Sequence, residues 1–211
     1  MGQGETEVEH TVVLVHGIFD TGKIFAPMAR YFAGHGLRTH APDLRPCSGA
    51  QGLEMLARQL KQVIDTLDAQ IGPESTLDLV GFSMGGLISR YYLQRLGGLE
   101  RVRRFVAISV PQHGSRWAWF LPNQGCRQMR PGSPFLQDLN QDIASLAQID
   151  LLTLWTPLDL MIIPAGSSVI PVGRECKIPV LLHDWMIKDS RVLKAMADFL
   201  LEPEPVGPVA R

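Results

Sequence analysis

Short apolar runs alternate along this chain with longer segments of helical periodicity. Six runs have the length and composition of strands: residues 11–15, 37–41, 77–80, 104–109, 151–155 and 178–182. Between and after them, residues 53–67 and 192–200 repeat apolar positions at three and four residues, which is the period of an amphipathic helix. Ser190 is a candidate N-cap for the last of these helices.

A further helix is predicted to begin at Pro134, directly after the cap candidate Ser133. The apolar side chains expected to face inward from it are Phe135, Leu139, Ile143 and Leu146. Strands alternating with helices predict an α/β fold with a mostly parallel sheet covered on both faces. We expect one domain over residues 1–202, without a large cap domain, followed by a disordered proline-rich tail at 203–211.

Composition narrows the function classes. The 20 lysines and arginines against 21 acidic residues give a net charge of −1, so no nucleic-acid partner is expected. The three cysteines, Cys47, Cys126 and Cys176, are widely spaced and form no CxxC pair, which favours a reducing compartment and speaks against a metal site. No secretory signal or membrane-spanning run is evident, so the expected location is cytoplasmic, at most peripheral to a membrane.

The chemical signal is the stretch Gly-Phe-Ser-Met-Gly, which places Ser83 between an apolar strand and a helix. Flanking glycines in that context permit the strained turn that lifts a nucleophilic serine above a sheet. A glycine-rich strand-to-helix turn without any chemistry is the competing interpretation. The predicted helix start beneath Ser83 also favours negative charge nearby, so we interpret Ser83 as a nucleophile.

A serine nucleophile requires a histidine base and an acid that orients it. His183 follows the last predicted strand and is the expected base. His113 is the runner-up, but it would precede every acid at the end of the next strand and break the order serine, acid, histidine. Asp159 lies past the fifth predicted strand and is the expected acid, although an ordinary turn aspartate would look the same.

The remaining candidates fit less well. Asp150 lies at the wrong end of its strand, and Asp184 and Asp189 follow the histidine in sequence. His10, His35 and His40 are expected to be solvated surface residues.

Acyl transfer also needs backbone donors for an oxyanion. The amide of Met84, the residue after the nucleophile, is one candidate. The loop after the first strand supplies the other, with Ile18 preferred and Phe19 in reserve, while His16 is expected to be a structural histidine of that loop. A bare turn ending the strand remains the alternative for this loop.

These segments together resemble the α/β-hydrolase superfamily, and within it small bacterial lipases of the lipase class 2, triacylglycerol-lipase-like group. The resemblance lies in LVHGIFDTGKIF, LVGFSMGGLISRYYLQRLGG, ISVPQHGS, TPLDLMIIP and LLHDWMI, and CRQMRPGSPFLQDLN is similar to cyanobacterial forms. The resemblance covers Val12 to Leu201 and implies hydrolysis of carboxylic esters of acyl lipids. It implies a triad of Ser83, Asp159 and His183 and an oxyanion hole formed by the amides of Ile18 and Met84.

The loop that follows the fourth predicted strand carries Trp117, Trp119 and Phe120, which together with Phe19 are candidate substrate-binding residues. Packing in the core is an equal alternative for the three loop aromatics. Arg101, Arg103 and Arg104 are more simply a solvated strand entry than a lipid-phosphate site.

The predicted function is therefore a serine esterase or lipase that needs no metal or organic cofactor. Its expected partner is an acyl ester or membrane glycerolipid substrate, with a peripheral membrane contact. An acyl thioesterase, an acyltransferase and a non-catalytic lipid-binding module on the same scaffold are the alternatives. The oligomeric state stays open.

Overall fold

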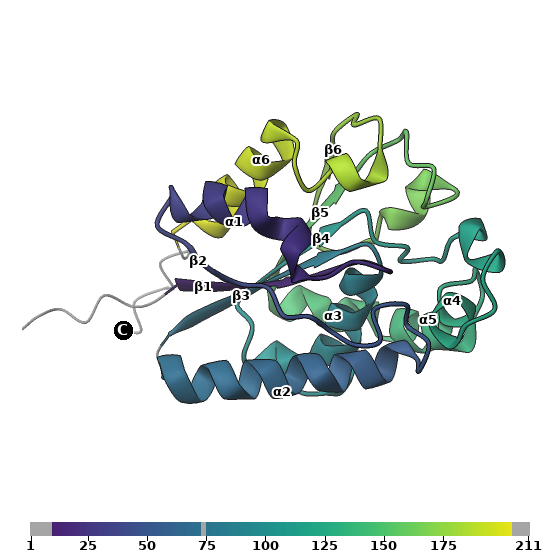
Figure 1. The fold of residues 1–211 in the computed structure, drawn as a ribbon, viewed down its shortest axis with the longest axis horizontal. Helices are drawn as coiled ribbons and strands as arrows, with labels where there is room; N and C mark the ends of the chain where they lie inside the picture. The colour runs from purple at the N-terminus through teal and green to yellow at the C-terminus, as the bar shows by residue number, and fades with distance from the viewer. Residues whose placement is uncertain (1–9, 73–74, 204–211) are drawn as a thin grey trace, which may run out of the picture.

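The computed structural model describes residues 10–72 and 75–203 and contains a six-stranded, wholly parallel sheet with the strand order β2-β1-β3-β4-β5-β6. Helices lie on both faces of this sheet, with α1 and α6 above it and α2, α3 and α5 below it in Figure 1. The strands are β1 (His10–Val15), β2 (Arg38–His40), β3 (Thr76–Phe82), β4 (Arg104–Ile108), β5 (Asp150–Trp155) and β6 (Arg174–Lys177). The predicted α/β class is confirmed, and residues 10–72 and 75–203 contain no large cap domain, as expected.

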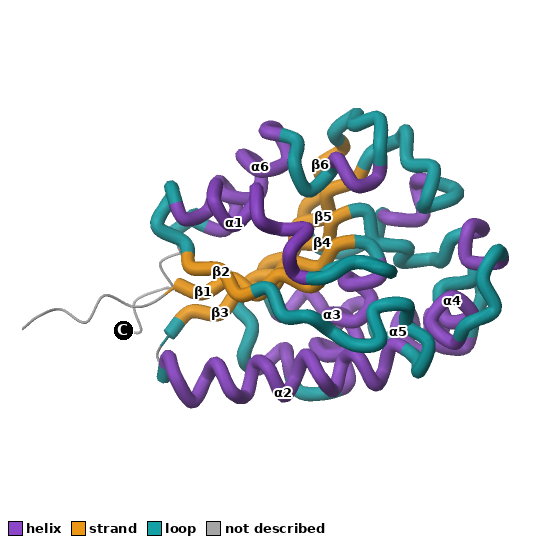
Figure 2. The backbone as a smooth tube through the Cα atoms, viewed as in Figure 1, coloured by secondary structure: helices purple, strands orange, loops and turns teal. Residues whose placement is uncertain are grey.

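The longer α-helices cover the faces of the sheet, and the shorter helices lie within the connections between its strands (Figure 2). The α-helices are α1 (Ala26–Ala33), α2 (Leu53–Ile71), α3 (Met84–Arg95), α4 (Gln124–Gln128), α5 (Pro134–Gln141) and α6 (Ser190–Leu200). Two short 3-10 helices matter for the site, η3 (Arg116–Trp119) and η6 (His183–Trp185). The expected proline-rich tail at 203–211 lies outside the described residues except for its first position.

The two sides of the sheet bury separate cores because successive strand residues point to opposite faces. From β1, Val13 and Val15 join the core beneath α2 and α3, whereas Val12 and Leu14 join the core beneath α1 and α6. From Thr11 to Val15 both faces of β1 are therefore buried, as expected for a central parallel strand.

The order of the strands creates a switch point between β1 and β3, which are neighbours in the sheet. The chain leaves β1 toward α1 on one face and leaves β3 toward α3 on the other (Figure 1). In open α/β sheets a crevice forms outside the carboxyl ends of two strands whose connections diverge in this way. Ser83, which follows β3, lies at this point.

The prediction of a sixth strand at residues 178–182 is wrong, because β6 comprises Arg174–Lys177. This edge strand is polar and exposed, so it carries no apolar signal. Ile178 and Val180 are nevertheless buried. The backbone of Val180 bonds to the side chain of Thr156 instead of to a strand, and an intervening proline has no N–H to offer.

Smaller corrections concern the helices. The predicted helix at Pro134 exists and is capped by the Ser133 side chain, but it ends at Gln141, and a separate 3-10 helix carries the half-buried Ile143. The N-cap of α6 is Asp189, which accepts a hydrogen bond from an amide in the first turn, and the predicted cap Ser190 is the first helical residue.

The basic cluster at the entry to β4 is structural, but it is not the solvated strand entry that was expected, because its side chains are buried or half-buried and paired. Arg101 pairs with Asp68, and Arg103 pairs with the buried carboxylate of Asp78. Arg104 is 1% exposed and donates to the carbonyls of Leu200 and Glu202 at the end of α6. His10, expected to be solvated, is instead half-buried and hydrogen-bonded to Asp78.

Candidate active site

Ser83 occupies a strained backbone conformation between β3 and α3, with φ of 53° and ψ of −124°. Such a conformation costs on the order of 1–3 kcal/mol in a non-glycine residue and persists only when its surroundings impose it. The Ser83 amide donates to the carbonyl of Ile108 at the end of β4, and its carbonyl accepts from Gly86. These bonds tie the turn to the sheet on one side and to the helix on the other.

The glycines around Ser83 are required by close backbone approach. A Cβ at Gly81 would lie 2.5 Å from the Cα of Gly86, and one at Gly85 would lie 2.1 Å from the carbonyl oxygen of Val15. A Cβ at Gly86 would lie 2.0 Å from a methyl carbon of Val110. Any side chain at these positions would therefore push α3, and the turn that begins it, away from the sheet.

The loop after β1 passes directly over Ser83. A Cβ at Gly17 would lie 3.3 Å from the Cβ of Ser83, so this loop approaches the serine closely. His16 is fully buried; its Nε2 accepts from the Leu44 amide and its Nδ1 donates to the Gly17 carbonyl, both within 3.0 Å. This histidine fixes the loop, and both of its ring nitrogens are engaged.

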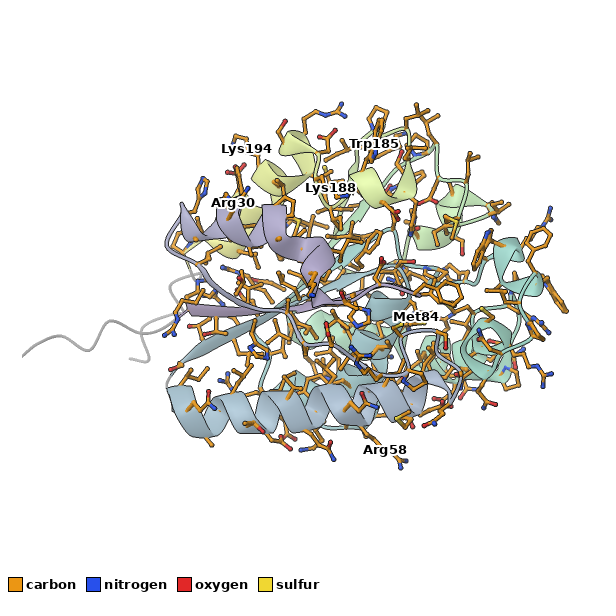
Figure 3. The ribbon with its side chains drawn as sticks, in the orientation of Figure 1. Arg30, Arg58, Met84, Trp185, Lys188 and Lys194 are labelled. Carbon is orange, nitrogen blue, oxygen red and sulfur yellow. The ribbon has the colours of Figure 1, made fainter. Side chains whose placement is uncertain are left out.

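The backbone N–H groups expected to face an oxyanion differ in whether they already have a hydrogen-bond partner. Phe19 has a φ of 63°, and its amide donates to the Cys47 carbonyl at 2.9 Å. Met84 is the first residue of α3, where backbone N–H groups have no partner within the helix. Figure 3 shows Met84 at this end of the helix, beyond the carboxyl ends of the strands.

The structure brings His183 and Asp159 into direct contact. His183 Nδ1 donates to Asp159 Oδ2 at 2.8 Å, which leaves the lone pair of the neutral ring on Nε2. His183 Nε2 is buried without a hydrogen-bond partner in the described parts of the chain. The imidazole packs against the ring of Phe82, with 4.8 Å between centroids, so it lies beside the residue that precedes Ser83.

The second oxygen of Asp159 fixes the orientation of the carboxylate. Asp159 Oδ1 accepts from the amides of Met161 and Ile162, each at 2.9 Å. Burial by itself raises the pKa of Asp159, but the hydrogen bond and charge of His183 and the two amides outweigh it. The net effect lowers the pKa of Asp159 below its usual 3.8, so the group is a carboxylate at neutral pH.

Asp20 is a further carboxyl group near the serine. Its Oδ2 lies 3.1 Å from the position of a Cβ built at Gly17. Burial and the negative charge of Asp184 raise the pKa of Asp20, although electrostatic interactions with His16, His183 and Lys188 oppose the rise. Asp20 carries no distinguishing signal in the sequence, because an aspartate in a loop after a strand is an ordinary turn residue.

Two buried hydroxyl groups hold the loops that carry Asp159 and His183. Thr156 Oγ1 donates to the carbonyl of Val180 and accepts from the amides of Leu158 and Val180. Ser115 Oγ donates to the carbonyl of Met161 and accepts from two amides, including that of Trp117. These positioning residues were missed as such, because their roles depend on loops that are distant in sequence.

A small cavity of about 20 Å³ adjoins Ser83. Its wall is largely apolar and includes Ile18, Pro111, Ser115, Trp117, Ala118, Met129, Met161 and Ile162. Trp117 is half-buried against the core, whereas Trp119 and Phe120 are 61% and 78% exposed. Packing in the core therefore does not explain Trp119 or Phe120, whereas Trp117 is the one of these aromatics that lines the cavity beside the serine.

His113, the runner-up base, does not join this group. It is exposed, its Nε2 contacts the carbonyl of Val169, and its Nδ1 contacts Asn140. In the described parts of the chain, no group of three or more His, Cys, Asp or Glu side chains is placed to hold a metal ion. Nor does any helix in those parts have the length and apolar content to cross a membrane.

Comparison with known proteins places this geometry in a family. Residues 10–169 match the family model of the alpha/beta hydrolase fold, a segment that includes Ser83 and Asp159 and ends before His183. The chain therefore belongs to the α/β-hydrolase family.

Solved structures with the same fold come from enzymes of several kinds. A Bacillus licheniformis lipase in mature form has a TM-score of 0.72 at 18% identity, over 92% of this chain and 93% of that chain. Aspergillus fumigatus lipase B has a TM-score of 0.80 at 16% identity, over 93% of this chain and 54% of its own. A pyrethroid hydrolase of Sphingobium faniae has a TM-score of 0.61 at 16% identity, over 92% and 97%.

Proposed function

We propose that the protein is a serine hydrolase that cleaves carboxylic esters of acyl lipids. Ser83 attacks the ester carbonyl, and His183 Nε2 takes the serine proton and passes it to the departing alcohol. Water activated by the same nitrogen then releases the acid from the acyl-serine. Asp159 holds the ring with its Nδ1 protonated and stabilises the imidazolium that forms.

The observation that carries this proposal is the 2.8 Å bond between His183 Nδ1 and Asp159 Oδ2 beside the strained Ser83 turn. The bond directs the proton of neutral His183 to Nδ1 and leaves the unpartnered, buried Nε2 as the base. A glycine-rich turn without chemistry gives no reason to bury a hydrogen-bonded histidine and carboxylate beside it. The lipase neighbours support the proposal at the level of fold.

The proposed oxyanion hole combines the amides of Met84 and Ile18. The Met84 amide lies at the N-terminus of α3, where the helix dipole favours negative charge. Because the Phe19 amide is engaged with Cys47, Ile18 is the donor we assign to the loop after β1. Loss of one such donor raises the barrier by about 3 kcal/mol in acyl-transfer enzymes.

The test is hydrolysis of p-nitrophenyl esters across acyl lengths by the natural chain and by Ser83→Ala. Ser190→Ala is the matched control, because Ser190 is exposed at the first position of α6. We expect Ser83→Ala to abolish hydrolysis and Ser190→Ala to retain it. A fluorophosphonate probe should label the natural chain and the Ser190→Ala variant at Ser83, but not the Ser83→Ala variant. Equal hydrolysis by the natural chain and Ser83→Ala would exclude Ser83 as the nucleophile.

A further inference from the structure

Exposed apolar side chains are concentrated at one end of the molecule. Of nine large apolar side chains exposed in the described parts of the chain, eight lie in the loops that follow β1, β4, β5 and β6. They are Phe19, Trp119, Phe120, Leu158, Leu160, Leu181, Leu182 and Trp185. Single exposed apolar residues need no explanation, but a concentration around one edge marks an interaction surface.

The same loops carry the candidate catalytic residues. Phe19 follows Ile18, Leu158 and Leu160 flank Asp159, and Leu182 precedes His183. Leu160 is 72% exposed, whereas Asp159 between the two leucines is 6% exposed. The apolar rim therefore surrounds the approach to Ser83, and whatever covers the rim also faces the site.

Charge near the rim indicates the chemistry of the partner. Residues 110–133, the segment that joins β4 to the cap of α5, contain three arginines and no aspartate or glutamate, in a chain of net charge −1. Arg116 is exposed and forms no ion pair with a described residue, whereas Arg127 lines a separate groove together with Glu54 and Asp138. Arg130 lies over the ring of Trp119, 4.3 Å from its centroid, so a cation and an exposed indole are held together. Asp184, which directly follows His183, is exposed and is the acidic residue next to the rim leucine and tryptophan of the same loop.

We propose that the rim docks on an anionic lipid surface, with Trp119 and Phe120 inserted among the acyl chains and Arg116 against lipid phosphates. Exposed aromatic side chains beside an unpaired arginine suit the boundary between headgroups and acyl chains. A second copy of the chain fits less well, because a two-fold contact through the η3 and α4 segment would place its arginines against their own counterparts. Docking in this orientation would present bilayer lipids to Ser83.

The test measures binding without turnover, by flotation of the Ser83→Ala chain with vesicles. Vesicles of phosphatidylcholine alone are compared with vesicles that also contain phosphatidylglycerol. We expect binding to the anionic vesicles that weakens as salt is raised. Trp119→Ala with Phe120→Ala should weaken it by about tenfold or more, because two aromatic side chains no longer leave water.

Matched controls lie elsewhere on the molecule. Leu201→Ala removes the ninth exposed apolar side chain, which lies at the opposite end of the sheet from the rim. The neighbouring residue Leu200 shows this, because its carbonyl accepts a hydrogen bond from Arg104 at the start of β4. Arg58→Ser removes an exposed arginine from α2, where Figure 3 shows Arg58 pointing away from the molecule. Arg116→Ser should weaken binding about fivefold, whereas the two controls should leave it unchanged.

Three results would overturn the proposal. The first is that the protein does not float with anionic vesicles. The second is that the rim variants and the control variants lose equal amounts of vesicle binding. The third is that the protein is a dimer in solution and that the Trp119 and Phe120 substitutions dissociate this dimer. The last would assign the rim to a second copy of the chain. Because flotation requires no catalysis, a negative flotation result would not bear on the ester hydrolysis proposed for Ser83, which the p-nitrophenyl ester assay tests separately.

Discussion

Replacing Asp159 with asparagine should disable His183 while leaving its position almost unchanged. Asp159 Oδ1 accepts two amide hydrogen bonds at 2.9 Å, from Met161 and Ile162. In Asp159→Asn the amide oxygen remains on these donors, so the NH₂ group faces His183 Nδ1. That nitrogen must then accept, and its proton moves to Nε2, where it prevents removal of the serine proton.

The size of the effect follows from the alternative orientation of the asparagine. Turning the amide over would restore the bond from His183 Nδ1 but would set the NH₂ group against two backbone N–H groups. Each buried donor left without an acceptor costs about 1–3 kcal/mol, so the competent arrangement is disfavoured by roughly 2–6 kcal/mol. At about 1.4 kcal/mol per decade, this corresponds to a fall in kcat of about 30-fold to 10⁴-fold. Loss of the carboxylate charge beside the imidazolium lowers kcat further, so we expect kcat to fall by about 10³-fold or more.

The assay is steady-state hydrolysis of a soluble p-nitrophenyl ester near pH 7.5, with stability measured in parallel by urea unfolding. Asp184→Asn is the matched control, because it makes the same change in an exposed residue adjacent to His183. We expect Asp184→Asn to keep kcat within about threefold and Asp159→Asn to unfold at a similar urea concentration. A folded Asp159→Asn protein whose kcat lies within tenfold of the natural chain would refute the tautomer argument.

Further predictions test the supports of the site. Gly86→Ala should destabilise the fold by about 3 kcal/mol, because the new Cβ would lie 2.0 Å from Val110, where ordinary contacts are about 3.5–4.0 Å. In the double variant Gly86→Ala, Val110→Ala, part of this lost stability should return when it is measured by urea unfolding. If the stability losses of the two single substitutions simply add, the clash with Val110 is contradicted. Thr156→Val should lower kcat about tenfold or more, because the loops that carry Asp159 and His183 lose the hydroxyl that bonds to both of them. An unchanged kcat in the folded variant would count against this positioning role of Thr156. Trp117→Ala should raise the ratio of octanoate to acetate ester hydrolysis about tenfold by enlarging the 20 Å³ cavity, and a constant ratio would exclude Trp117 as the wall.

A last prediction concerns acid stability. The pKa of Asp159 in the folded protein lies below its usual 3.8, so its contribution to stability is present at neutral pH and is lost as pH falls through the lowered value. The free energy of unfolding of the natural chain should therefore fall more steeply below about pH 4 than that of Asp159→Asn. Parallel slopes in urea titrations at several acidic pH values would contradict this.

Much of the fold could be predicted from local patterns. Five of the six strands were predicted, and four of them, β1, β3, β4 and β5, coincide with apolar runs, because buried parallel strands require apolar residues on both faces. The fifth, β2, is a short polar edge strand whose apolar signal comes from Leu37 and Ala41 at its two ends. The sixth could not be found in this way, since β6 is an exposed polar edge strand. In the apolar run after it, Ile178 bonds to the last residue of β5, but Val180 already bonds to the side chain of Thr156. Edge pairing depends on what the neighbouring strand offers, and a sequence window does not contain that information.

The amino-acid sequence by itself determined the class of fold, the strained position of Ser83 and the order of serine, acid and histidine candidates. These depend on local chemistry: glycines where no Cβ fits, a helix start after a strand, and the periodicity of buried positions.

Only the tertiary structure decided which groups meet. The contact of His183 with Asp159, the engagement of the Phe19 amide by Cys47, and the hydroxyl clamps of Thr156 and Ser115 join residues that are distant in sequence. The exposure of Trp119 and Phe120, which periodicity left open, was also decided there. Hydrogen bonds act over about 3 Å in space, whatever the distance along the chain, so these contacts exist only once the loops at the carboxyl edge have been brought together.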